Sequence, residues 1–313
     1  MYDKLVREHY YPLRLTPTFL ETFVDVAGTP ESPILGANWE VLPWHSDDDG
    51  VADLVSAIPM LYLRGALVRS TATVTGAVEA YLSSGGLDDS VTTAATRVFG
   101  VGNAFGRVSG NYWAAFVLRG ADNILYAELN LGGTLQQVDL GPQLHDYGLF
   151  TSSDFNGNFR VEPAGAGFRF YRDNVLVASL DGVFPDTVAP KILVGSHHES
   201  SEMFVDYIEA GPYASGGSYT SVVHDERVSG TWGRLVIRLD MPQLHNTSLL
   251  FETRTGETAS VDDSWSAWET LGADDMIQSP DGRYIQVRVT LITTNSQRTP
   301  LFYGYEIDAR PAA

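Results

Sequence analysis

The sequence predicts an all-β protein made of two antiparallel β-sandwich domains in tandem, preceded by a short N-terminal arm. Three observations lead to this prediction. Short runs of alternating or aromatic-rich residues recur almost from end to end, bounded by Gly, Asn, Asp and Pro. No longer stretch keeps the apolar stripe of a helix. The 313 residues also exceed the roughly 250 to 300 at which a single core usually divides.

The first sandwich is predicted from a series of strand-like runs that ends near residue 210. In "FRFYRDNVLVASL" the pair Asp173 and Asn174 tolerates positive φ and is expected to join two strands as a tight hairpin. The segment "FVLRGADNILYAEL" repeats this pattern one hairpin earlier. The expected strands are 61–67, 73–82, 112–119, 124–131, 158–162, 168–172, 175–180, 191–196 and 203–210.

A linker is expected at 211–218, where "GPYASGGS" gathers Gly, Pro and Ser between two strand-rich regions. Turns every 8 to 12 residues or so favour antiparallel sandwiches over a parallel sheet. The strands expected after the linker are 235–239, 249–255, 265–269, 284–291 and 302–307. The predicted parts are therefore an arm at 1–18, a first sandwich at 19–212 and a second at 218–313.

The charge and composition exclude several functions. The net charge of −19 argues against a nucleic-acid or anionic-membrane partner, either of which would require a basic face. No window approaches about 18 consecutive apolar residues, so we expect no membrane insertion. The absence of Cys excludes disulfides, thiolate metal sites and a Cys nucleophile. The opening "MYDKLVREHYYPL" carries early charges and a Pro, so no signal peptide is expected.

Two family resemblances cover nearly the whole chain after residue 18. Residues 19–212 resemble the concanavalin A-like, laminin-G-like jelly-roll family, through "FVDVAGTPESPILGANWEVL", "NYWAAFVLRGADNILYAELN", "FRFYRDNVLVASL" and the closing "MFVDYIEAGPY". Residues 218–309 are similar to discoidin-type, galactose-binding-like sandwiches, through "TWGRLVIRLD", "LLFETRTGETASVDDSWSAWETLG" and "SPDGRYIQVRVTLITT". These resemblances imply the fold and a general habit of binding, but no particular ligand.

The closing strand "EMFVDYIEA" is the place to look for catalytic carboxylates. Retaining glycosidases of this fold carry them at alternating positions on one strand face, about 5 to 5.5 Å apart. Strict alternation puts Glu202 and Asp206 on one face and Glu209 on the other, with Phe204 between the first two. The carboxylate pattern of the glucanase branch is missing, and no nucleophile-elbow or phosphate-loop motif is present. The sequence therefore predicts a protein that is not an enzyme.

No cofactor is expected except a structural Ca²⁺, which jelly-roll modules often hold between their first and last strands. Glu21, Asp25 and Asp206 stand where such ligands could originate, although the same acids could be solvated loop residues. The adjacent His197 and His198 point to opposite sides of an extended chain, so they cannot easily share one ion.

A carbohydrate contact is predicted at the acidic loop "WHSDDDG" and at one further tryptophan. Trp44, His45, Asp47 and Asp49 could form one wall of a sugar site, although an exposed solvated loop is the alternative. An EF-hand reading of this loop fails at its fifth and twelfth positions. Trp232 lies beside turn residues and is expected at the surface. Four aromatics within strand-like runs are expected in the cores: Trp113, Phe116, Trp265 and Trp268.

The sequence is compatible with two functions. The first is a non-enzymatic structural or adhesive protein of a bacteriophage virion, in the tail or on the capsid surface, because binding sandwiches without an export signal suit a particle assembled in the host cytoplasm and released by lysis. Its partners would be other virion proteins, further copies of the chain in a homo-oligomer, and a host surface glycan. The docking residues would lie in the arm: Tyr2, Leu5, Tyr10, Tyr11 and Leu13. The alternative is a carbohydrate-binding accessory module or glycosidase fragment of a secreted bacterial protein.

Overall fold

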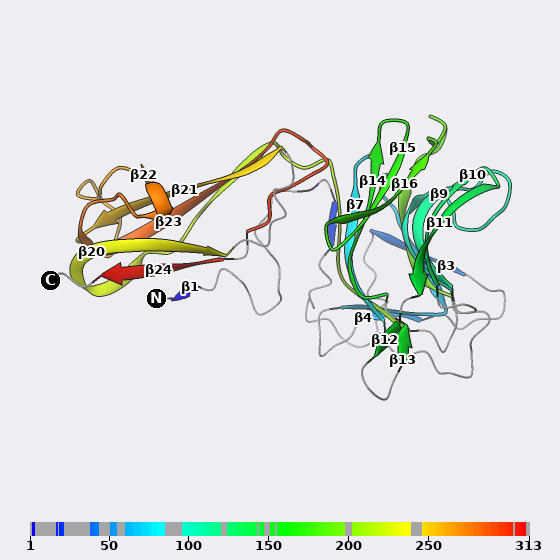
Figure 1. Cartoon of the computed structure of the whole chain (residues 1–313), viewed down its shortest axis with the longest axis horizontal. Helices are drawn as coiled ribbons and strands as arrows, with labels where there is room; N and C mark the ends of the chain where they lie inside the picture. Colours follow the sequence, from blue (N-terminus) through cyan, green and yellow to red (C-terminus); the bar gives the residue numbers. More distant parts are fainter. Residues whose placement is uncertain are drawn as a thin grey trace. The chain divides into compact units, whose positions relative to one another are not determined.

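The computed structural model describes two compact units of the chain (Figure 1). One unit comprises Pro17–Pro212, and the other combines Met1–Thr16 with Tyr213–Ala313. The described residues are 2–3, 17, 19–21, 38–43, 51–54, 60–84, 96–119, 124–142, 144–146, 151–153, 155–197, 202–238, 246–302 and 304–310.

The all-β prediction is confirmed. The named sheets are built from antiparallel pairs, and the described residues include only one short helical turn, a 3₁₀ segment at Ala273–Asp275. No helix in this part of the chain is long and apolar enough to cross a membrane.

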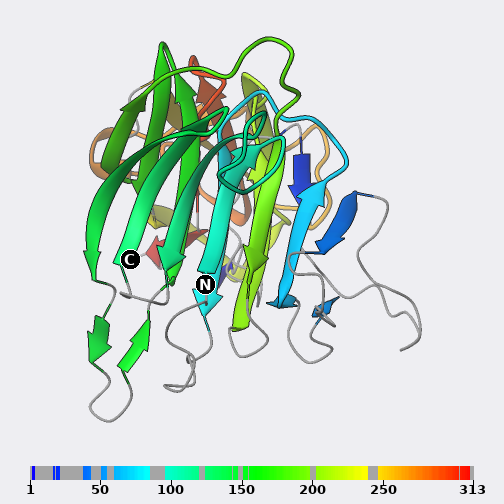
Figure 2. The same cartoon turned by 90° about the vertical axis from the view of Figure 1, so that its right-hand side faces the viewer.

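The unit 17–212 contains two large antiparallel sheets whose apolar faces form one core. We call the first the front sheet, and Figure 2 looks onto its outer face. Its spatial order is β11 (Thr134–Pro142), β10 (Ile124–Leu131), β9 (Tyr112–Arg119), β8 (Thr96–Gly102), β17 (Lys191–Ser196), β6 (Ala66–Ser70) and β3 (Trp39–Pro43).

We call the second large sheet the back sheet. Its order is β16 (Val175–Asp181), β15 (Gly167–Arg172), β14 (Gly157–Ala164), β7 (Val78–Ser84), β18 (Glu202–Ala210), β5 (Leu61–Arg64) and β4 (Val51–Leu54), with β2 (Phe19–Glu21) also pairing β18. A separate ribbon joins β12 (Leu144–Asp146) and β13 (Thr151–Ser153).

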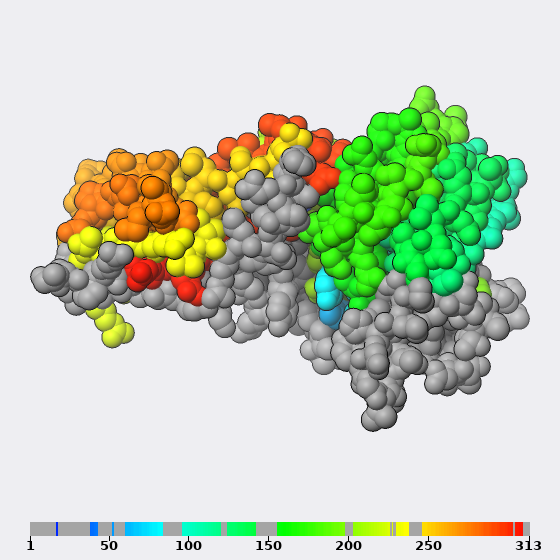
Figure 3. Space-filling model, in the orientation of Figure 1, coloured from blue at the N-terminus to red at the C-terminus, as the bar shows by residue number. Residues whose placement is uncertain are grey.

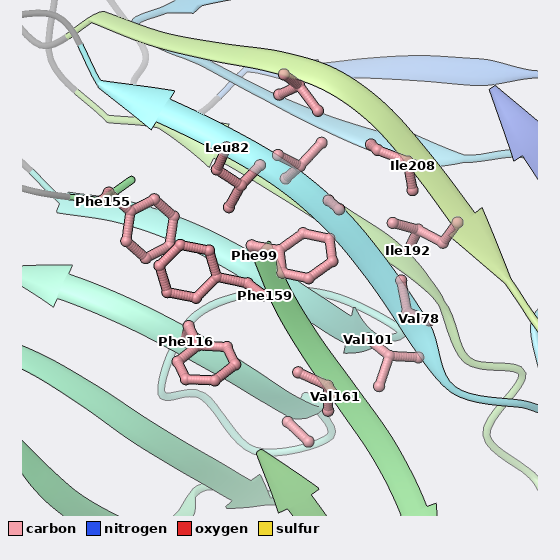
Figure 4. Close-up of a cluster of buried hydrophobic side chains, with 14 of the residues drawn as sticks. Val78, Leu82, Phe99, Val101, Phe116, Phe155, Phe159, Val161, Ile192 and Ile208 are labelled. Atoms are coloured by element: carbon pink, nitrogen blue, oxygen red, sulfur yellow. The ribbon is translucent and has the colours of Figure 1, made fainter. Parts of the chain in front are cut away.

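Aromatic side chains fill the core between the two sheets (Figure 4). Phe116 from the front sheet contacts Phe159 and Phe170 from the back sheet, with ring centroids 5.0 and 5.4 Å apart. All three side chains are fully buried. Burial of a large apolar side chain contributes about 1.5 to 3 kcal/mol, so this cluster is a main source of the unit's stability.

Turn residues account for two details of strand placement. Asp173 and Asn174 both adopt positive φ, at 49° and 64°, which confirms the predicted hairpin between β15 and β16. Gly65 also has positive φ, at 64°, and it separates β5 from β6. The single strand predicted at 61–67 is therefore wrong, and its two halves belong to different sheets.

The unit that contains Tyr213–Ala313 is a second antiparallel β-structure with its own core. Its strands are β20 (His224–Arg238), β21 (Thr247–Gly256), β22 (Glu269–Thr270), β23 (Gly282–Thr293), β24 (Gly304–Arg310) and β19 (Gly216–Thr220). The strand predicted at 265–269 is wrong. Only Glu269 is extended there, because the preceding residues form a loop closed by hydrogen bonds between Thr255 and Ser266.

The start of the chain was predicted to be a separate arm, but two of its residues pair with a strand of the second unit. Strand β1 (Tyr2–Asp3) pairs antiparallel with β24, with Tyr2 opposite Glu306 and Asp3 opposite Tyr305. An edge strand offers unpaired backbone groups, so a nearby extended segment can satisfy them. The other predicted docking residues, Leu5, Tyr10, Tyr11 and Leu13, lie outside the described residues.

Candidate functional site

A row of side chains crosses the outer face of the front sheet. Side chains alternate between the two faces along a strand. Phe116 and Ala127 face the core, so their chain neighbours Ala115 and Glu128 lie on the outer face of the sheet. Strand register continues this row across the whole sheet. In order it runs Glu40, Arg69, Leu193, Gly100, Ala115, Glu128 and Gln137. Charged or polar groups occupy both ends, and small or apolar residues the middle.

At one end of the row, Arg69 is held by Glu40. The Arg69 guanidinium donates to Glu40 Oε2 at 2.6 and 3.1 Å, and its Nη1 donates to the Asn103 carbonyl oxygen at 2.8 Å. The hydrogen bond and charge of Arg69 lower the pKa of Glu40, and the more distant Lys191 adds to this effect. Glu40 is therefore an ionised acceptor at neutral pH, and its side chain is 41% exposed.

At the other end, the buried carboxylate of Glu128 lies between two arginines. Arg119 Nη2 donates to Glu128 and also to Gln137 Oε1, the latter at 3.3 Å. Arg107 approaches the same carboxylate oxygen at 3.5 Å and is 52% exposed. The Arg119 guanidinium also lies 4.5 Å from the ring centroid of Tyr126. A buried charge requires such partners, and these contacts hold both guanidiniums in place.

The loop between β8 and β9 folds back onto this face. Phe105 packs on Trp113 with centroids 4.6 Å apart, and the Trp113 indole N–H donates to the Gly106 carbonyl oxygen at 3.1 Å. Asn111 Nδ2 donates to the Phe105 carbonyl oxygen at 3.2 Å. This anchoring explains why Arg107, within the same loop, reaches Glu128.

We call Glu40, Arg69, Arg107, Arg119, Glu128 and Gln137 the front-face polar row. It presents guanidinium and amide donors together with carboxylate and amide acceptors. Neither end relies on a loop alone, because all members except Arg107 belong to strands. Sequence reasoning missed this row, since its members are scattered over five strands and one loop, and only the strand register brings them into line.

The closing strand β18 differs from its sequence prediction. A β-bulge lies between Val205 and Tyr207, so Val205 and Ile208 both face the core although strict alternation would separate them. The prediction that Glu209 and Asp206 lie on different faces of the strand assumed strict alternation, and the bulge makes it wrong. The register instead places Glu209 directly opposite Glu79 of β7.

Glu79 and Glu209 are directly opposite on adjacent strands, a register at which Cβ atoms are about 4.5 to 5.5 Å apart. Both side chains are buried, at 5% and 0% exposure. Glu79 Oε1 accepts hydrogen bonds from Asn158 Nδ2 at 2.8 Å and from the Tyr207 hydroxyl at 3.3 Å. In this arrangement Glu79 belongs to a closed polar network on the back sheet.

The predicted calcium ligands are only partly described. Glu21 lies in β2 opposite Ile208, two residues from Asp206, while Asp25 lies outside the described residues. Within the described part of the chain, no group of three or more His, Cys, Asp or Glu side chains is arranged to hold a metal ion. The calcium site stays a prediction.

The predicted carbohydrate-contact residues have different outcomes. Trp44, His45, Asp47 and Asp49 lie outside the described residues. The surface position predicted for Trp232 is wrong, because this side chain is 4% exposed and belongs to the core of the second unit. Placing Trp113, Phe116 and Trp265 among the buried residues is right. Trp268 is not among them: it is partly exposed and lies over two arginines, because it follows a loop rather than a strand.

A hollow of about 250 Å³ opens in the same unit as the polar row. Its walls come from the β14–β15 hairpin, the loop before β7 and the loop between β16 and β17. Phe168 and Phe184 pack together in this wall with centroids 4.7 Å apart. The lining is mainly apolar, with Thr75 and Asp186 as its polar side chains, so it offers little to orient a polar ligand.

No family model matches this chain, and no curated protein matches it. Solved structures similar to it include the catalytic domain of a laminarinase from Thermotoga maritima MSB8, with 14% identity, 63% of this chain and 97% of the other covered, and a TM-score of 0.44. A β-glucanase from Bacillus licheniformis is 12% identical, with 61% of this chain and 96% of the other covered and a TM-score of 0.42. A carbohydrate-binding module from Bacillus subtilis is 14% identical, with 55% of this chain and 96% of the other covered and a TM-score of 0.35. The unit 17–212 is a jelly-roll β-sandwich, as its two antiparallel sheets show.

These comparisons correct the prediction that the chain is not an enzyme. Glycoside hydrolases are prominent among the similar structures, and the face count on β18 that supported the prediction is wrong. The bacteriophage and discoidin parts of the sequence resemblance receive no support from them.

Proposed function

We propose that this chain is a carbohydrate-binding protein and that the outer face of the front sheet is its glycan-binding surface. The observation that carries the proposal is the front-face polar row, in which two pre-ordered arginine–glutamate groups flank Gly100 and Ala115. Sugar hydroxyls donate and accept hydrogen bonds at once, so a surface that binds them requires both kinds of group held in fixed positions.

The geometry supports a glycan lying along the row. Residues directly opposite on adjacent strands are about 5 Å apart, which approximates the length of one sugar ring, so an extended chain would meet successive strands. Gly100 and Ala115, in the middle of the row, are buried, and a Cβ on Gly100 would clash with the Ala114 carbonyl oxygen, so a glycan would contact the exposed charged groups at the two ends of the row. Arg107 and Glu40 are the more exposed charged members, and each is already fixed by a partner.

Binding to polymers tests the proposal. The probes are β-1,3-glucan, mixed-linkage β-1,3-1,4-glucan and mucin glycans, measured by affinity electrophoresis and calorimetry with the full chain. We expect binding to at least one, and about tenfold weaker binding for Arg107→Ala, a loss of roughly 1.4 kcal/mol. Release of reducing ends from the bound polymer is measured in the same samples, which separates binding alone from hydrolysis.

The chain offers a closely matched control in Arg234. It is also 52% exposed, and its Nη2 lies 3.6 Å from Asp275, as Arg107 lies 3.5 Å from Glu128. Arg234→Ala should leave glycan binding unchanged, since Arg234 lies in the other unit. Equal losses for the two variants, or no binding to any probe, would contradict the proposal.

The virion setting inferred from sequence remains a proposal of its own. In this setting the bound glycan would be a host surface polysaccharide. The partners would be other virion proteins and further copies of this chain, and the protein would be located on the particle. Immunodetection of the chain in purified particles, compared with its detection in secreted bacterial fractions, distinguishes this setting from the alternative of a secreted carbohydrate-binding or glycosidase protein.

A further inference from the structure

The second unit carries a surface cluster that the proposed function does not use. Trp268 lies over the outer side of β21 and β23, where four polar side chains form two cross-strand pairs. Glu252 is opposite Arg288, and Arg254 is opposite Gln286. We call these five residues the Trp268 platform. Its polar members face outward because their neighbours along each strand, Thr253 and Val287 among them, are fully buried.

Hydrogen bonds fix the two guanidiniums of the platform. Arg254 donates from Nε and Nη2 to Gln286 Oε1 at 3.0 and 2.6 Å, and Arg288 donates from Nε to Glu252 Oε2 at 2.7 Å. Each guanidinium carbon also lies 4.5 Å from the Trp268 ring centroid. Cation–π contacts of this kind hold the indole in position.

The loop that precedes Trp268 is ordered by its own contacts. The Trp265 indole N–H donates to Thr258 Oγ1 at 3.1 Å, and Trp265 itself is buried. Asp262 accepts from the Ser264 backbone N–H at 2.9 Å and from the Thr258 hydroxyl at 3.1 Å. The platform therefore stands on a sheet and on an internally bonded loop. In Figure 3 the atoms of β21 and of this loop, in yellow and orange, form part of the visible surface.

The platform has unused donors and a local positive charge. Across the described residues, Arg254 Nη1 and both Nη atoms of Arg288 form no hydrogen bond, nor does the Trp268 indole N–H. Two arginines face one carboxylate, Glu252, in a chain whose net charge is −19. Both guanidiniums lie beside the same indole ring, and burial together with the neighbouring charge of Arg288 lowers the pKa of Arg254.

We propose that the Trp268 platform binds an acidic carbohydrate, with the indole against a sugar ring and the two guanidiniums on its carboxylate or sulfate group. Arginine N–H groups pair with planar carboxylates in a bidentate manner, and an anion between the cations would offset their repulsion. The indole supplies a rigid surface with one polar edge, which suits a ring that has apolar C–H groups and hydroxyls. The site goes beyond the proposed function, since it lies in the other unit and selects a charged ligand.

Calorimetry with the full chain tests the proposal, using polygalacturonate, its fully methyl-esterified form and inorganic sulfate at equal ionic strength. We expect polygalacturonate to bind at least tenfold more tightly than the ester, and its affinity to fall when salt rises from about 0.05 to 0.5 M because exposed charges are screened. Trp268→Ala and Arg288→Gln should each weaken it about tenfold. Trp268→Tyr, which keeps a ring, provides a second variant if Trp268→Ala does not fold.

Arg283→Gln is the matched control. Arg283 lies on the same strand, β23, stacks on an aromatic ring at 4.9 Å, and pairs with a carboxylate, but it is not part of the platform. It should retain affinity within about twofold, and so should Arg234→Ala, at another exposed arginine of this unit that lies outside the platform. Equal binding of the ester, full competition by inorganic sulfate, or platform variants that bind like the control would each overturn the proposal.

Discussion

Arg160 donates a hydrogen bond from Nη2 to Glu162 Oε2 across 2.9 Å, and both side chains are almost completely buried on the back sheet. The other terminal nitrogen, Nη1, lies 3.8 Å from Glu79 Oε2. One guanidinium thus serves two buried carboxylates from neighbouring strands. Its aromatic neighbour is Tyr171, whose ring centroid lies 5.7 Å away.

Removal of this guanidinium should destabilise the jelly roll strongly. Arg160→Met keeps most of the side-chain volume but leaves two buried carboxylates without their cation, which typically costs about 3 to 5 kcal/mol. Urea unfolding followed by tryptophan fluorescence measures the change. Arg172→Met, at a guanidinium that is 26% exposed, is the control and should cost less than half as much. Equal losses for both variants would show that the buried network has no special role.

Phe116 should be among the most sensitive core positions. Phe116→Ala removes a fully buried ring that contacts Phe159 and Phe170, and we expect a loss of about 3 to 5 kcal/mol in the free energy of unfolding. Val175→Ala, at a side chain that is 64% exposed, should change stability by less than about 0.5 kcal/mol. Chemical denaturation of the two variants provides the comparison, and a loss below about 1 kcal/mol at Phe116 would contradict the described core.

Asp225 should stabilise the second unit in a pH-dependent way. Arg283 donates two hydrogen bonds of 2.8 Å to its carboxylate, which lowers the pKa of Asp225 from 3.8 to about 2. Because the folded pKa lies below the unfolded one, the contribution is fully present above about pH 4 and is lost as the pH falls through about 2. The stability difference between the wild type and Asp225→Asn should therefore shrink over that range. Carboxyl NMR titration of Arg283→Gln should show the midpoint of Asp225 returning toward 3.8. An unchanged midpoint would remove Arg283 as the cause.

Trp232 should act through stability and not through ligand contact. Trp232→Ala removes a side chain from the core of the second unit, so we expect a loss of about 3 to 5 kcal/mol, measured as a lower midpoint of thermal or urea unfolding. Trp268→Ala should cost much less, since that ring is partly exposed. Under conditions where the Trp232→Ala variant remains folded, its affinity for polygalacturonate should match that of the wild type.

The fold class could be predicted from sequence because its signals are local. Alternating or aromatic-rich runs identified β9 and β10, and the Asp173–Asn174 pair marked the hairpin between β15 and β16. Strand β8 was missed, since "TRVFGVG" combines a continuous apolar run with glycines, and a buried strand of this kind lacks alternation. The predicted strand at 61–67 failed because a single Gly65 moves the chain from one sheet to the other.

The candidate sites could not be predicted in the same way. Glu40 and Glu128 share a row only through the pairing of strands that are far apart in the chain, and no local pattern indicates that register. The bulge after Val205 changes which residues of β18 share a face, although nothing in "EMFVDYIEA" marks it. Trp265 and Trp268 are three residues apart in similar surroundings, yet the hydrogen-bonded loop buries the first and leaves the second partly exposed.

Hydrogen–deuterium exchange of the full chain, with and without a bound neutral β-glucan oligosaccharide, tests whether the front-face polar row binds a glycan. We expect slower exchange in the loop between β8 and β9, in β10 and in β11, where Arg107, Glu128 and Gln137 lie, and unchanged exchange in the back-sheet strands β15 and β16. Protection confined to the back sheet or to the second unit, with none over the front-face polar row, would contradict it.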